Sequence, residues 1–86
     1  MYIKVCPQNT GDHYMFECER YTFGLLEDGK LTAASNNTYV FPQEQEKYNS
    51  ELWLYKGDDF IAHLVCSECV VYIMSDEGKT IDTIWT

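Results

Sequence analysis

Two turn sequences of nearly the same composition constrain the fold of this chain most strongly. They are residues 27–30 (Glu-Asp-Gly-Lys) and 76–79 (Asp-Glu-Gly-Lys). Apolar runs rich in β-branched and aromatic residues flank each turn, at 21–26 and 31–34 and again at 70–74 and 81–85. Because glycine supplies the positive φ of a tight hairpin turn, and acidic residues commonly precede it, each of these segments predicts an antiparallel hairpin.

A third turn of this kind, Gly57-Asp58, joins the runs 51–56 and 60–66. A short connection at Ser67-Glu68 leads from there into the run 69–75, so the last four strands are predicted to form one meander. Alternate turns of a meander lie at the same end of the sheet. We therefore expect Asp58 and Asp59 to lie near Asp76 and Glu77, which gives an acidic rim.

The whole chain, residues 1–86, has the length of one domain. Its aromatic content of 15 % suits strands, on whose pleated surfaces flat rings pack well. The expected fold class is all-β, or β-dominated α+β, with six to eight strands in a small antiparallel meander or partly open barrel built from hairpins. Residues 43–50 contain enough good helix formers for one short helix. For residues 59–67, a helix with Asp59 as its N-cap is the alternative to a strand.

The net charge of −8, from fourteen acids against six bases, argues against direct binding to DNA or RNA. A protein that binds phosphate backbones normally carries a cationic surface. An acidic surface instead fits a basic protein partner, such as a nuclease or another nucleic-acid-binding protein.

The seven tyrosines exceed what a small core needs, and tyrosine is enriched where proteins meet proteins. Acidic turns flanked by tyrosines therefore predict a surface that binds a basic protein. The expected partner-binding residues are Glu27, Asp28, Tyr55, Asp58, Asp59, Tyr72, Asp76 and Glu77.

Cys66 and Cys69 have the two-residue spacing of a zinc knuckle or a redox pair. Structural zinc needs four ligands, and Cys6 and Cys18 are the remaining cysteines. Since both lie inside strand-like runs, where cysteine behaves as a small buried hydrophobe, we expect four free thiols and no cofactor. A zinc-stabilised structural domain that uses all four cysteines is the alternative.

No pattern of catalytic residues is apparent, and an enzyme is not expected. His13 and His63 are the only imidazoles, and His63 lies in the middle of a strand-like run, which indicates a structural side chain. The carboxylate pairs lie at exposed turns, where burial does not tune a pKa for acid–base catalysis.

In composition, as a short, acidic and tyrosine-rich chain, this sequence resembles anti-defence proteins of phages, including anti-CRISPR proteins and DNA mimics. The resemblance implies a non-enzymatic inhibitor that blocks a basic, nucleic-acid-binding surface of its partner. The sequence has no secretory signal and no apolar run long enough to span a membrane, so we expect a cytoplasmic protein, in a bacterial host if it is phage-encoded.

Overall fold

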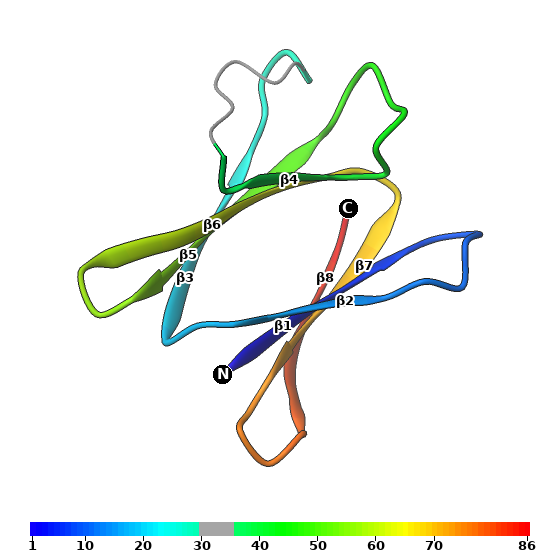
Figure 1. Cartoon of the computed structure of the whole chain (residues 1–86). Helices are drawn as coiled ribbons and strands as arrows, with labels where there is room; N and C mark the ends of the chain where they lie inside the picture. The colour runs from blue at the N-terminus through cyan, green and yellow to red at the C-terminus, as the bar shows by residue number, and fades with distance from the viewer. Residues whose placement is uncertain (30–35) are drawn as a thin grey trace.

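The computed structural model describes residues 1–29 and 36–86, and every regular element in this part of the chain is a β-strand (Figure 1). The strands are β1 (Tyr2–Pro7), β2 (Tyr14–Glu17), β3 (Arg20–Leu25), β4 (Thr38–Phe41), β5 (Ser50–Lys56), β6 (Asp59–Cys66), β7 (Cys69–Met74) and β8 (Thr80–Trp85). The all-β class is therefore confirmed. Residues 43–50 form no helix, and none of the described residues belongs to a helix that could cross a membrane.

The strands form two four-stranded sheets, which Figure 1 shows crossing each other. The first sheet has the order β2-β1-β7-β8 and the second has the order β3-β5-β6-β4. The two sheets are not closed into a barrel. The chain passes from one sheet to the other after β2 and again after β6.

Residues from alternate positions of the strands fill the space between the sheets, as the two-residue period of a strand requires. Ile3 of β1 and Leu52, Leu54 and Leu64 of the second sheet are completely buried. Burying a side chain of this size stabilises the fold by about 1.5–3 kcal/mol relative to leaving it in water. This core holds the two sheets together.

The hairpins predicted at Gly57 and Gly78 are confirmed. β5 pairs with β6, β7 pairs with β8, and the two glycines have φ values of 58° and 85°. Gly29 also has a positive φ of 67°, but the expected return strand at 31–34 lies outside the described residues.

The meander predicted for the last four strands is wrong, because β6 and β7 belong to different sheets. The connection at Ser67-Glu68 is a corner, in which Glu68 has a φ of 53°. The Ser67 amide donates to the carbonyl of Phe41 in the second sheet, and the Gln8 amide donates to the carbonyl of Glu68. The corner is thus hydrogen-bonded on one side to the end of β4 and on the other to the residue that follows β1.

One strand pair is parallel, where an antiparallel sheet was expected. β4 runs parallel to β6, and both Phe41 and Ser50 pair with Cys66. The segment between Phe41 and Ser50 therefore only has to pass over the end of β6. β4 ends, and β5 begins, at the end of the sheet where β6 ends. β4 therefore runs antiparallel to β5 and, since β5 and β6 are antiparallel, parallel to β6.

Candidate functional site

The acidic residues expected to bind a partner are exposed at three turns. They are Glu27 and Asp28 after β3, Asp58 and Asp59 between β5 and β6, and Asp76 and Glu77 between β7 and β8. Tyr55 and Tyr72 are half-buried on β5 and β7.

These turns do not form one rim. The β5–β6 and β7–β8 hairpins end at separate corners of the molecule (Figure 1), as follows from their membership of different sheets. Glu27 and Asp28 lie by Glu68 around a shallow pocket of about 430 Å³. Glu68 is at the opposite ends of β6 and β7 from the other two acidic turns, so the carboxylates occupy three separate places.

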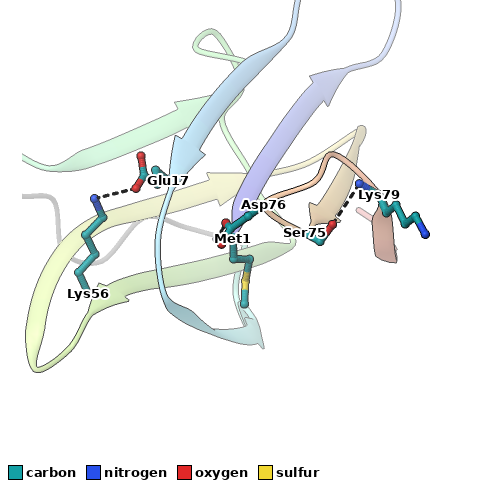
Figure 2. A network of polar contacts seen from close by, with 6 residues as sticks. All are labelled: Met1, Glu17, Lys56, Ser75, Asp76 and Lys79. Atoms are coloured by element: carbon teal, nitrogen blue, oxygen red, sulfur yellow. Dashed lines mark hydrogen bonds and ion pairs between the residues drawn. The ribbon is translucent and has the colours of Figure 1, made fainter.

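Two cationic side chains lie beside the β5–β6 turn and reduce its local negative charge. Lys56 is 3.4 Å from a carboxylate oxygen of Glu17, as Figure 2 shows. The guanidinium of Arg20 lies 4.1 Å from the ring centre of Tyr55, and its Nε donates to the carbonyl of Gly57 at 3.3 Å.

At the β7–β8 turn, Asp76 accepts a hydrogen bond from the amino group of Met1 (Figure 2). This hydrogen bond raises the pKa of that amine, although partial desolvation acts the other way. Within the same turn the Lys79 amide donates to the Ser75 hydroxyl at 3.1 Å. The carboxylate of Glu77 is exposed and makes no such contact with any residue that the structure describes.

A groove with a volume of about 980 Å³ lies between β2 and β4. The β2–β4 groove is lined by Tyr14 and Phe16 from β2 and by Tyr39 and Phe41 from β4. Tyr14 and Phe16 are opposite Val5 and Ile3 in the strand pairing, so they point to the inner face of the first sheet. The groove therefore lies where the space between the sheets opens to solvent.

Ring contacts hold the two strands of the groove in an antiparallel arrangement. The ring centres of Tyr14 and Phe41 are 4.8 Å apart, and those of Phe16 and Tyr39 are 5.2 Å apart. Such tilted and edge-on contacts are favourable geometries for aromatic pairs. Within the described residues, β2 pairs only with β1 and β4 pairs only with β6. The edges of β2 and β4 are therefore connected by side chains, whereas a closed barrel would connect them by backbone hydrogen bonds.

The four aromatic residues differ in how far they are exposed. Phe41 is 7 % exposed and belongs to the core, whereas Tyr14 and Tyr39 are 43 % and 44 % exposed. The two tyrosines are therefore partly exposed to solvent in the groove, whereas Phe41 is buried beside them. The carbonyl of Pro42, just after Phe41, accepts a hydrogen bond from Tyr48 at 2.8 Å, which holds the end of β4.

Charge in the groove is confined to one end. Asp12 precedes β2 and Glu44 follows β4, and both line the groove. Since Tyr14 contacts Phe41, these two carboxylates lie at the same end. Among the described lining residues there is no lysine or arginine, and His13 lies next to Asp12 at this end.

A buried imidazole lies on the outer face of the second sheet. Nε2 of His63 is 2.8 Å from a carboxylate oxygen of Glu51, and Nδ1 is 3.3 Å from the Thr38 hydroxyl. The ring also stacks on Trp53, with centres 3.7 Å apart and planes 12° apart. Both ring nitrogens thus have a polar partner, which explains how a residue only 3 % exposed is accommodated here.

The four cysteines do not converge. Cys66 and Cys69 meet in the core, and Cys18 is buried in the core at the corner after β2. Cys6 pairs with Val70 at a position facing away from the core. The hydrogen bond with Cys69, together with burial, raises the pKa of Cys66, and the same bond lowers the pKa of Cys69. No three His, Cys, Asp or Glu side chains are grouped to hold a metal ion in the part of the chain that the structure describes.

The aromatic residues of the groove were not among the expected site residues. Their signal is present in the sequence, because Tyr14 and Phe16, like Tyr39 and Phe41, are separated by one residue and so share a face of a short strand. That the edges of these two strands meet depends on the crossing of the sheets, which a local pattern does not encode.

No protein-family model matches this chain, and comparisons with curated proteins and with solved structures also find no match, so its site is interpreted from its own geometry.

Proposed function

We propose that this chain is a non-enzymatic protein-binding module that blocks a basic surface of a partner protein, such as the nucleic-acid-binding surface of a nuclease. The observation that carries the proposal is the exposure of carboxylates at three turns of an acidic domain. The carboxylates of Glu27, Asp28, Asp58, Asp59 and Glu77 make no hydrogen bond or ion pair to any described residue.

Carboxylates of this kind contribute little to folding, since exposed ion pairs are worth about 0–1 kcal/mol. Their combined field instead raises the rate at which a cationic partner is encountered. Because the acids occupy three separate places, the partner surface must also be broad, or must make contact at one turn while the others attract it from a distance.

The test begins with a partner, which is captured with the immobilised chain from a lysate and confirmed with the purified proteins. The association rate is then measured for the parent and for a variant with Asp58→Asn, Asp59→Asn, Asp76→Asn and Glu77→Gln. We expect association to be slower by about tenfold or more at low ionic strength, and the difference to shrink as salt screens charges beyond about 10 Å.

A control variant removes the same number of charges elsewhere on the exposed surface, by Glu19→Gln, Glu46→Gln, Glu68→Gln and Asp82→Asn. We expect it to associate faster than the first variant. Equal rates for the parent and the first variant at low salt would contradict the proposal, because the acidic turns would then serve only solubility.

A further inference from the structure

The free edge of β2 opens onto the β2–β4 groove. β2 pairs with β1 along all of its length, from Tyr14↔Val5 to Glu17↔Tyr2. On its other side β2 has no strand partner among the described residues. Such an edge presents backbone N–H and C=O groups in the geometry that another strand requires.

We propose that an extended segment of the partner protein, with Lys or Arg at one end, lies in this groove as an added strand along β2. The inference rests on the proposed protein-binding function and states which part of the chain makes the close contact. Strand addition is a common mode of peptide recognition, in which main-chain hydrogen bonds give affinity and pockets for alternate side chains give specificity.

The dimensions of the groove fit such a segment. β2 has four residues, which at about 3.3 Å per residue span about 13 Å. The groove volume of about 980 Å³ is at the upper end of the range of about 300–1,000 Å³ that small-molecule sites occupy. The groove is therefore large enough for a segment of several residues.

The aromatic rings determine which side chains the segment should carry. A strand beside β2 points every second side chain to the face on which Tyr14 and Phe16 lie. Tyr39 is on the opposite wall of the groove, 5.2 Å from Phe16. Apolar residues at alternate positions would thus pack against the exposed sides of these rings, and the intervening residues would face solvent.

The charged end of the groove determines which charge the segment should carry at that end. Asp12 and Glu44 both line the end of the groove beyond the Tyr14–Phe41 contact. A Lys or Arg at one end of the segment would be attracted by these exposed carboxylates. An acidic segment would be repelled by them.

The experiment uses a probe peptide, so it does not depend on the natural partner. The probe is acetyl-Lys-Val-Thr-Val-Thr-Val-Lys-amide, titrated to about 1 mM into the full-length, ¹⁵N-labelled chain and followed by NMR. We expect shifts confined to the groove, with cross-strand nuclear Overhauser contacts between the peptide and the backbone of 14–17. A peptide with glutamate in place of lysine should not bind, and one N-methylated at the amides facing β2 should bind at least about tenfold more weakly.

Two exposed aromatic residues provide a matched pair of variants. Tyr39 lies in the groove and Phe23 lies on β3, and both are 44 % exposed. Tyr39→Ala should weaken peptide binding at least about tenfold, while Phe23→Ala should leave it unchanged. Tyr14→Ala serves as a second groove variant if Tyr39→Ala does not fold.

Three outcomes would overturn the inference: no binding at about 1 mM, equal affinity for the N-methylated peptide, or equal loss in both aromatic variants. These outcomes are distinguishable from failure of the proposed function. If the parent captures a basic partner in the lysate experiment but the probe does not bind the groove, only the strand-addition inference fails. If no partner depends on the acidic turns, the proposed function fails whatever the peptide does.

Discussion

The hydrogen bonds of His63 provide a direct test of how the second sheet is stabilised. The change is His63→Leu, which fills a similar volume but removes the contacts to Glu51 and Thr38 and the stack on Trp53. Because His63 is only 3 % exposed, the partners it leaves behind have limited access to water.

The expected loss can be worked from these contacts. A hydrogen bond to a charged group contributes about 1.5–3 kcal/mol, and an aromatic stack adds about 0.5–1.5 kcal/mol. Burying the apolar leucine offsets about 1–2 kcal/mol of this. The Glu51 side chain keeps 23 % of its exposure and hence some water. We therefore expect the free energy of unfolding to fall by about 2 kcal/mol, which lowers the Tm by about 8–16 °C in a domain of this size.

The assay is urea unfolding followed by tryptophan fluorescence, with a double variant as the control. Glu51→Leu combined with His63→Leu leaves no carboxylate without its partner, and replacing both partners by apolar groups costs less than removing one. The double variant should be more stable than His63→Leu alone, with a coupling free energy of about 1 kcal/mol or more. If His63→Leu is as stable as the parent, or if the double variant is the less stable, the hydrogen bonds do not support the sheet as argued.

Three further changes test the turns and the thiols. Gly78→Val should destabilise the fold by about 1–3 kcal/mol, because Gly78 has a φ of 85°. An added Cβ meets no other atom there, so the loss comes from backbone strain alone, and Gly78→Asn should cost less in the same urea-unfolding assay. Burial raises the pKa of the Cys18 thiol above its usual 9.0, so this thiol ionises first in the unfolded chain. The parent should therefore lose stability as the pH rises above about 9, and Cys18→Ala should lack this part of the pH dependence. Elemental analysis should find no stoichiometric zinc, and denatured protein should titrate as four free thiols per chain; one bound zinc, lost in Cys66→Ser, would contradict the placement of the cysteines.

Local turn chemistry accounts for the part of the fold that could be predicted. β7 and β8 cover the runs expected at 70–74 and 81–85, because the turn at Gly78 joins them. A glycine with positive φ leaves the chain few alternatives to a tight reversal. Strand limits next to such residues can therefore be read from the sequence.

The corner at Ser67-Glu68 could not be distinguished from a hairpin turn by the same reasoning. A two-residue connection between apolar runs permits either a return beside the same strand or a change of sheet. The outcome depends on the hydrogen bonds that Ser67 and Glu68 make to Phe41 and Gln8, which are distant in sequence. The expected acidic rim depended on this step, and its carboxylates are separated for that reason.

The acidic turns should affect the association rate of the complex, and the groove should affect its dissociation rate. Long-range charge mainly sets how fast two proteins meet, and salt weakens it, whereas close packing mainly sets how long they stay together. Neutralising Asp58 and Asp59 should thus slow association with little effect on dissociation, and Tyr39→Ala should do the reverse. The β5–β6 and β7–β8 turns lie away from the end of the groove at Asp12 and Glu44. The losses of binding free energy should therefore add when the changes are combined. A combined variant whose loss of affinity differs from the sum by more than about 0.5 kcal/mol would place the turns and the groove in one contact surface.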